Sequence, residues 1–299
     1  MGLIILMIFL TILLSISLII TIYVWLSVKI RLHKKVSYEQ ALNVELKEIT
    51  KHHLQVAIYY KNKQIYQTIS TRYGELDLYK FGNTNKFVIF VHGIWSNNRS
   101  VIKVVDYFVA RGFTVIAYDN YGWGKSRRFG ITTMGKKESF LLKDVIKFTK
   151  IHFQPHELFV YGESMGGATV YKFIKTFDSK SVDKFIVNAG YMSLFRNVIN
   201  LGKKQLWYFI YLAYLPLLLV FWLQKWPIKP FLKKQELSKM TNVYHLHAIK
   251  DNLVSYDGIK KYLPYVKNHI YTNPNVRHVC GWYDAIDEQN KILDKWIKE

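Results

Sequence analysis

The apolar residues divide the chain into an uncharged N-terminal segment and a long region in which short apolar runs alternate with amphipathic ones. Short runs that are mostly apolar predict strands at 87–91, 114–118, 158–161, 185–187 and 243–248, and a further strand is expected near 268–271. Patterns with the helical period predict helices at 101–111, 138–151, 165–176, 255–265 and 285–297. Strands that are apolar on both faces and alternate with helices indicate one α/β domain, built on a mostly parallel sheet with helices on both faces.

The N-terminal segment 1–28 carries no charged side chain and is long enough to cross a bilayer. Tyr23 and Trp25 lie near its end, where interfacial aromatic residues are common. A cleaved signal peptide would have a basic start, a shorter apolar run and a small-residue cleavage site, and these are lacking. We therefore expect 1–28 to be an uncleaved single-pass transmembrane anchor. Four basic residues follow within 29–35, which predicts that the rest of the chain lies on the cytoplasmic side.

The rest of the chain falls into a connector and a main domain. Residues 29–50 form a basic juxtamembrane connector whose part from 37 to 50 favours a helix, and 51–299 form the α/β domain. Alternation over 54–60 and 64–69 predicts a β-hairpin at the start of that domain. The stretch 192–240 interrupts the strand and helix rhythm, and we expect it to be an inserted lid. Within it, 206–223 is uncharged and apolar, with Pro216 at its centre.

Composition narrows the functional classes. The chain has 299 residues, half of them hydrophobic, and a formal charge of +21. The lysines are dispersed and form no basic run interleaved with aromatics, so attraction to anionic lipids is favoured over nucleic acid binding. A second explanation of the positive charge has equal weight: the chain is rich in Lys, Ile, Tyr and Phe throughout, as proteins of AT-rich genomes often are. The single cysteine, Cys280, excludes an internal disulfide, and we find no metal-ligand cluster or phosphate-cradling loop.

The stretch Gly162-Glu163-Ser164-Met165-Gly166 has the spacing Gly-x-Ser-x-Gly between a predicted strand and a predicted helix. This spacing is typical of a nucleophile elbow, a tight turn that exposes a serine hydroxyl above the sheet. Glycines are needed on both sides because the helix passes close to the strand. The alternative is an ordinary tight turn with an idle serine. The position between strand and helix favours Ser164 as a catalytic nucleophile.

A serine nucleophile needs a histidine base and a carboxylate that orients it. Asp251 follows the strand 243–248, and His278 lies in the loop before the last helix, so the chain order is Ser, Asp, His. Weaker candidates for the acid and the base are Asp257, His269, His245 and His247. The first falls within a predicted helix, the second in or beside a strand, and the last two precede the acid. The sequence therefore predicts a triad of Ser164, Asp251 and His278.

An oxyanion hole needs two backbone N–H donors. One is predicted at Met165, the residue after the nucleophile, and the other at Ile94 in the loop after strand 87–91, with Trp95 as the next choice. Trp95, Glu163 and Tyr191 lie beside these positions and are candidates for substrate contact.

With the elbow, HGIWSN at 92–97, Asp251 and His278, the chain resembles the α/β-hydrolase superfamily from about residue 87 to its end. More narrowly, it is similar to the bacterial serine aminopeptidase S33-like hydrolases. That resemblance is carried by YDNYGWGKS at 118–126, GITTMGKKE at 130–138 and NAGYMSL at 188–194. It implies an eight-stranded sheet, no cofactor, and cleavage of esters, thioesters or amides through an acyl-enzyme.

These observations predict a membrane-anchored serine hydrolase of carboxylic esters or thioesters, with an acyl or lipid-like substrate and membrane lipids as partners. A single crossing by 206–223 would put Ser164 and His278 on opposite sides of the membrane, so that segment is a lid or lies in the interface. A serine aminopeptidase is the first alternative, but it needs a carboxylate for the α-ammonium, and we expect Glu163 to point away from the pocket. A non-catalytic membrane-bound binding protein is the second. The oligomeric state stays open.

Overall fold

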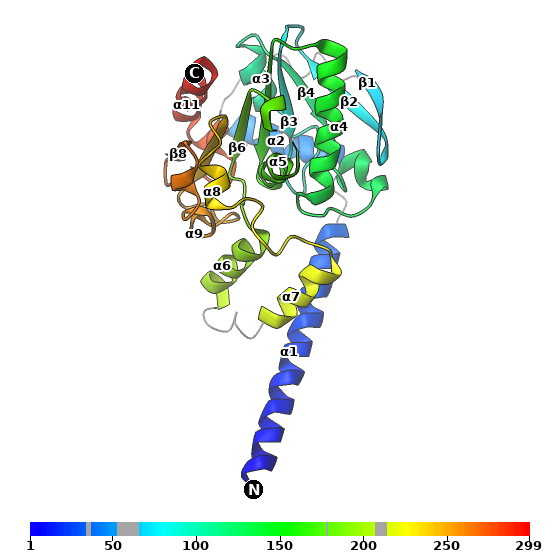
Figure 1. Ribbon diagram of the computed structural model, residues 1–299, viewed down its shortest axis with the longest axis vertical. Helices are drawn as coiled ribbons and strands as arrows, with labels where there is room; N and C mark the ends of the chain where they lie inside the picture. The colour runs from blue at the N-terminus through cyan, green and yellow to red at the C-terminus, as the bar shows by residue number, and fades with distance from the viewer. Residues whose placement is uncertain (34–36, 53–65, 178, 207–213) are drawn as a thin grey trace.

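The computed structural model describes residues 1–33, 37–52, 66–177, 179–206 and 214–299 (Figure 1). Its centre is an eight-stranded sheet with the order β1-β2-β4-β3-β5-β6-β7-β8. The strands are β1 (Gln67–Thr71), β2 (Gly74–Phe81), β3 (Lys86–Val91), β4 (Thr114–Tyr118), β5 (Glu157–Glu163), β6 (Lys184–Asn188), β7 (Val243–Ala248) and β8 (Asn268–Thr272). β2 is antiparallel to β1 and β4, and all other neighbours are parallel. The predicted α/β class is confirmed, and the chain has the α/β-hydrolase fold.

Helices connect the strands and precede them. They are α1 (Gly2–His33), α2 (Tyr38–Lys51), α3 (Ile102–Val109), α4 (Lys136–Phe153), α5 (Met165–Thr176), α6 (Leu194–Leu206), α7 (Tyr214–Leu223), α8 (Lys234–Leu237), α9 (Tyr256–Ile259), α10 (Gly281–Asp284) and α11 (Ile286–Lys298). The expected helix in the connector is present as α2. It begins with a capping box in which Ser37 Oγ accepts from Gln40 N at 3.1 Å and Gln40 Oε1 accepts from Ser37 N at 3.0 Å.

Two predicted elements differ from the structure. Most of the predicted hairpin, 54–60 and the start of 64–69, lies outside the described residues. The hairpin that the structure describes joins β1 to β2, whose alternating Leu76 and Leu78 were a strand signal absent from the predicted elements. The predicted helix 255–265 is wrong in length. The region consists of α9, which ends at Ile259, and a separate 3₁₀ turn at Leu263–Tyr265, in which Pro264 has no N–H to donate to the carbonyl of Lys260.

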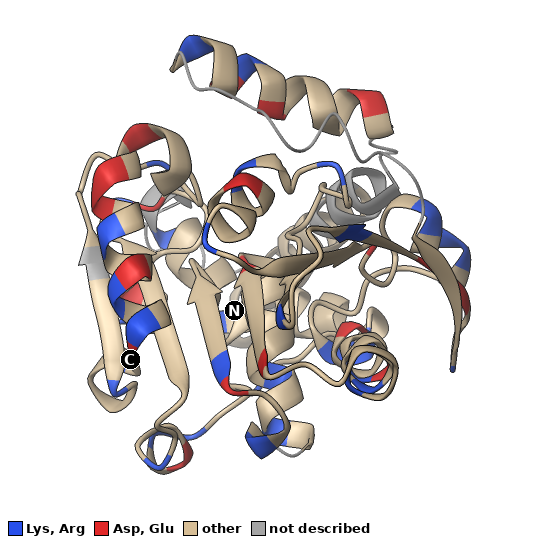
Figure 2. Cartoon of the chain, turned by 90° about the horizontal axis from the view of Figure 1, so that it is seen from above, with Lys and Arg blue, Asp and Glu red and all other residues tan. Residues whose placement is uncertain are grey.

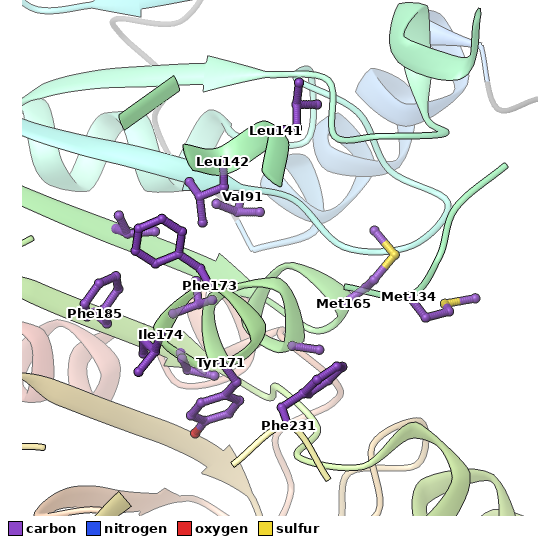
Figure 3. Close-up of a cluster of buried hydrophobic side chains, with 14 of the residues drawn as sticks. Val91, Met134, Leu141, Leu142, Met165, Tyr171, Phe173, Ile174, Phe185 and Phe231 are labelled. Atoms are coloured by element: carbon purple, nitrogen blue, oxygen red, sulfur yellow. The ribbon is translucent and has the colours of Figure 1, made fainter. Parts of the chain in front are cut away.

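Successive residues of the central strands face opposite sides of the sheet, which gives the domain two cores. On β3, Ile89 and Val91 face the core shared with α4 and α5, part of which Figure 3 shows. Val88 and Phe90 face the other core, which α3 and α11 cover. All four side chains are fully buried. Complete burial of such a side chain stabilises the fold by about 1.5–3 kcal/mol, an upper estimate. The sheet therefore holds its strand ends rigidly in place.

The chain leaves the sheet between β6 and β7, where α6 and α7 lie below the domain and α7 lies alongside α1 (Figure 1). Within the described residues, α1 is the one helix whose apolar stretch, Gly2–Tyr23, is long and apolar enough to cross a membrane. One side of α7 packs inward through Leu217 and Phe221. Its other side leaves Leu215 73% and Trp222 70% exposed. The structure thus places two strongly apolar helices together on one side of the domain.

Candidate active site

Ser164 lies at the turn between β5 and α5, with a positive φ of 55°. Non-glycine residues seldom adopt this backbone conformation, and it is typical of strained functional turns. A Cβ at Gly162 would lie 2.6 Å from the Gly166 carbonyl oxygen, and a Cβ at Gly166 would lie 1.9 Å from the Val91 carbonyl oxygen. Both glycines are therefore required by the close passage of α5 over the strands. The local geometry is that of the elbow expected from the sequence.

His278 and Asp251 are hydrogen-bonded side chain to side chain. His278 Nδ1 lies 2.6 Å from Asp251 Oδ2, and Asp251 Oδ1 accepts from the amides of Leu253 and Val254, both at 2.8 Å. Because an ionised carboxylate only accepts, His278 Nδ1 carries the proton and Nε2 is free to act as a base. Burial alone would raise the pKa of Asp251, but the hydrogen bond and charge of His278 and the Val254 amide hold it below its usual value.

Ser164 and His278 line one pocket of about 500 Å³ at the C-terminal ends of the central strands. Gly93 is close to the serine, since a Cβ there would lie 3.2 Å from Ser164 Cβ. In the described structure Ser164 and His278 do not hydrogen-bond to each other. Such bonds are often long in unliganded enzymes and shorten when substrate binds. The structure thus brings all three predicted triad residues to one place, with one of the two triad hydrogen bonds formed.

The weaker candidates for the acid and the base are engaged in other contacts. Asp257 is half exposed and pairs with Lys260 at 2.7 Å. His269 Nδ1 lies 2.9 Å from the Val266 carbonyl oxygen. His245 and His247 are buried in β7, where burial holds both pKa values below normal and that of His247 at about 4. The ring nitrogens of both contact other groups of the fold, namely the Tyr171 hydroxyl, each other and the Val254 carbonyl oxygen.

The predicted oxyanion donors, Met165 and Ile94, both line the pocket. Within the described part of the chain, neither amide donates to another backbone carbonyl. The loop that carries Ile94 is held by the buried His92, whose Nε2 accepts from Asn120 N at 2.8 Å and whose Nδ1 lies 2.8 Å from the Gly93 carbonyl oxygen. Two free amides beside a serine are able to stabilise an oxyanion.

The three predicted substrate-contact residues, Trp95, Glu163 and Tyr191, also line the pocket. Trp95 is 39% exposed and Tyr191 is buried. Glu163 turns one oxygen into the fold, since its Oε1 accepts from Trp282 Nε1 at 3.1 Å.

Other lining residues were not identified from the sequence. α2 contributes Ala41, Val44 and Glu45, and α6 contributes Leu194, Asn197, Val198 and Leu201. The helical pattern of 37–50 and the position of 192–240 identified these elements but not their contact with the pocket. The connector is therefore a wall of the site as well as a link.

Two carboxyl groups of the pocket wall have raised pKa values. Burial raises the pKa of Glu45 to about 8. The hydrogen bond from Tyr283 Oη lowers this pKa in part, and the negative charge of Glu163 raises it further. Burial also raises the pKa of Glu163 to about 7, although Trp282 and the charge of His278 oppose it. At neutral pH Glu45 is therefore largely protonated, and Glu163 is about half protonated. Among the described residues, no group of three or more His, Cys, Asp or Glu is placed to hold a metal ion.

Comparison with known proteins agrees with the fold. The family model of serine aminopeptidase, S33, matches residues 82–255, more than half of the chain. The chain belongs to this family of α/β-hydrolases. No match was found among curated protein sequences.

Several solved structures are similar to the chain. One is the Pyrococcus furiosus esterase Pf2001 (TM-score 0.62, 17% identity, 82% of this chain and 95% of that chain). Another is Est1E from Butyrivibrio proteoclasticus with ferulic acid bound (TM-score 0.58, 17% identity, 78% and 100%). A third is XC6422 from Xanthomonas campestris, described as an α/β serine hydrolase without lid (TM-score 0.54, 13% identity, 78% and 92%). At these identities the likeness concerns the fold.

Proposed function

We propose that the protein is a membrane-anchored serine hydrolase that cleaves carboxylic esters or thioesters of acyl, lipid-like substrates. The observation that carries the proposal is the 2.6 Å contact between His278 Nδ1 and Asp251 Oδ2 beside Ser164 at its strained turn. A buried carboxylate that orients a histidine next to a serine in the same pocket is the arrangement that activates a serine as a nucleophile.

In the first half-reaction, Ser164 Oγ attacks the substrate carbonyl carbon while His278 Nε2 takes the hydroxyl proton. Asp251 stays ionised and stabilises the imidazolium. The amides of Met165 and Ile94 donate to the oxyanion of the tetrahedral intermediate. The carbon–oxygen bond to the alcohol (carbon–sulfur bond in a thioester) then breaks, and His278 gives its proton to the leaving group.

In the second half-reaction, water attacks the acyl carbon of the ester on Ser164. His278 Nε2 takes a proton from that water and returns it to Ser164 Oγ as the serine leaves. The acid is released and the enzyme is regenerated, so the cycle needs no cofactor.

The pocket favours an acyl chain. Its wall is mainly apolar, with Val44 from α2 and Leu194, Val198 and Leu201 from α6. A volume of about 500 Å³ is within the range of small-molecule sites. The apolar span 2–23 supports an N-terminal membrane anchor, which would keep the site near lipid-like esters.

An aminopeptidase is the second candidate, and the family name favours it. Such an enzyme must hold the α-ammonium of its substrate with an ionised carboxylate. Glu163 and Glu45 are the carboxyl groups of the pocket wall, but burial raises the pKa of both, to about 7 and about 8. Ionising them costs free energy that cation binding would have to supply, so the ester is favoured. A non-catalytic binding protein would not need the Asp251–His278 bond.

Two measurements test the proposal on the full chain in detergent. Wild-type protein should be labelled by a fluorophosphonate probe, and Ser164→Ala should lose labelling and about 10⁶ in turnover. Ser100→Ala, at the pocket wall but outside the proposed triad, is the control and should be labelled normally. A panel of p-nitrophenyl esters of increasing chain length, with an aminoacyl p-nitroanilide, then compares ester with peptide preference. Labelling of Ser164→Ala at the wild-type rate would refute the assignment.

A further inference from the structure

We propose, on the basis of the function proposed above, that α7 and a lysine groove next to it form a surface that docks on an anionic lipid leaflet. The leaflet is the one on the domain side of the bilayer that α1 crosses. The apolar face of α7 would lie among acyl chains, and the lysines would contact lipid phosphates.

The position of α7 is the first observation. α7 lies beside α1 (Figure 1), and Ile20 of α1 packs against the apolar cluster that contains Leu217 and Phe221 of α7. Ile20 lies within the apolar span 2–23, about 5 Å before its end at 1.5 Å per residue. If that span crosses the bilayer, α7 meets it at a depth where acyl chains surround both helices.

The exposed side of α7 is the second observation. Leu215, Leu219, Trp222 and Leu223 are exposed, and the helix has no charged residue. Exposed large apolar side chains in a continuous group mark an interaction surface. A lipid leaflet is the expected partner, because the same acyl chains that would surround α1 would also contact the exposed side of α7 beside it.

The lysine groove is the third observation, and it is independent of α7. Lys136 of α4, Lys172 and Lys175 of α5 and Lys229 line a groove of about 370 Å³ together with Trp226 and Phe231. Lysine and arginine are otherwise spread over many elements (Figure 2). Lys175 pairs with Glu236, whereas Lys172 has no carboxylate partner within the described residues. Burial and the charges of Lys136 and Lys175 lower the pKa of Lys172, so a bound anion would relieve the repulsion.

The order of these features along the chain matches the layers of a leaflet. α7 ends at Leu223, and the groove begins at Trp226, at most about 10 Å further along the chain. Headgroup phosphates lie just outside the acyl region, so apolar side chains followed at once by lysines suit this boundary. α6, which precedes α7, supplies the pocket wall at Val198 and Leu201. Docking would therefore hold the pocket next to the leaflet from which an acyl substrate comes.

The test uses the full chain reconstituted in vesicles of phosphatidylcholine alone or with about one third phosphatidylglycerol. Two rates are measured, on a water-soluble short-chain ester and on a long-chain ester resident in the bilayer. We expect anionic lipid to raise the second rate about fivefold and to leave the first unchanged. Lys172→Gln/Lys229→Gln should lose the increase, and Leu215→Asp/Trp222→Asp should lose most activity on the bilayer ester in both vesicle types.

Control variants carry changes of the same kind elsewhere. Lys147→Gln/Lys291→Gln removes two exposed charges from α4 and α11, and Ile151→Asp changes an exposed apolar residue of α4. All should behave as wild type. The short-chain rate verifies folding in every variant. Equal bilayer-ester rates in both vesicle types, or a rise produced by millimolar inorganic phosphate in phosphatidylcholine vesicles, would overturn the docking surface. If the wild type showed no activity on the short-chain ester, the proposed function itself would be overturned.

Discussion

Arg277, which immediately precedes His278, forms a two-point ion pair with Glu48 of α2. Arg277 Nη1 and Nη2 lie 3.1 and 2.6 Å from the two carboxylate oxygens, across 229 positions of sequence. The same guanidinium also bonds Asp284, with Nη2 at 2.7 Å and Nε at 3.0 Å from its oxygens. The connector helix is thereby tied to the loop of the proposed base. This contact indicates that the connector helix α2 helps to hold the loop of His278 in position.

We expect Arg277→Ala to lower kcat for a short ester about tenfold with little change in KM, because a displaced base misses the serine proton. Glu48→Gln should act in the same direction. An exposed ion pair contributes only up to about 1 kcal/mol to stability. Both substitutions should therefore change kcat more than they change the free energy of unfolding. Arg72→Ala is the matched control, since Arg72 pairs with Asp144 in the same two-point way and does not line the pocket. Equal kcat in Arg277→Ala and Arg72→Ala would exclude the positioning role.

Asp251→Asn should reduce kcat by about 10⁴ while the protein stays folded. An amide at this position donates as well as accepts, so it allows the wrong histidine tautomer beside Ser164. Steady-state ester hydrolysis and a circular dichroism spectrum check both parts. Asp257→Asn removes an exposed carboxylate from the following helix and should leave kcat unchanged. If the two variants lost the same activity, Asp251 would not be the acid of the triad.

Gly166→Ala should destabilise the domain strongly, because the added Cβ would lie 1.9 Å from the Val91 carbonyl oxygen in the middle of the sheet. Backbone atoms cannot move aside cheaply there. Gly112→Ala is the comparison, since its φ is +77° but no atom lies within 4 Å of the added Cβ. Gly112→Ala should lower the free energy of unfolding by only about 1–2 kcal/mol. Thermal unfolding in detergent measures both, and similar melting temperatures would show that the elbow is not tightly packed.

The contribution of Glu45 and Glu163 to the stability of the folded protein should fall as pH rises from about 5 to 8. Glu45 and Glu163 have pKa values of about 8 and about 7 in the fold, above the ordinary value of 4.5. Between the two values the folded state holds more protons than the unfolded state, so raising the pH favours unfolding. This loss of stability is complete once the pH exceeds the pKa values that the two groups have in the folded state. The melting temperature of the wild type minus that of Glu45→Gln/Glu163→Gln should decrease as pH rises across this range, and a constant difference would show that these groups do not contribute.

Local patterns in the sequence were sufficient for the alternation of strands and helices and for the elbow at Ser164. They depend on residue periodicity and on glycine spacing, both of which act over a few neighbouring residues. Asp251 and His278 were predicted from the order of the strands, because parallel strands put their C-terminal ends on one edge of the sheet. Their 2.6 Å contact agrees with that rule.

Long-range packing was not readable from the sequence. An amphipathic pattern shows that a helix has a face to bury, but it does not name the partner. The pairing of Glu48 with Arg277, the packing of α7 against α1, and the gathering of Lys136, Lys172 and Lys229 each join parts of the chain that are far apart. Such contacts arise only when the whole domain closes, since their free energy comes from surfaces that no single segment contains.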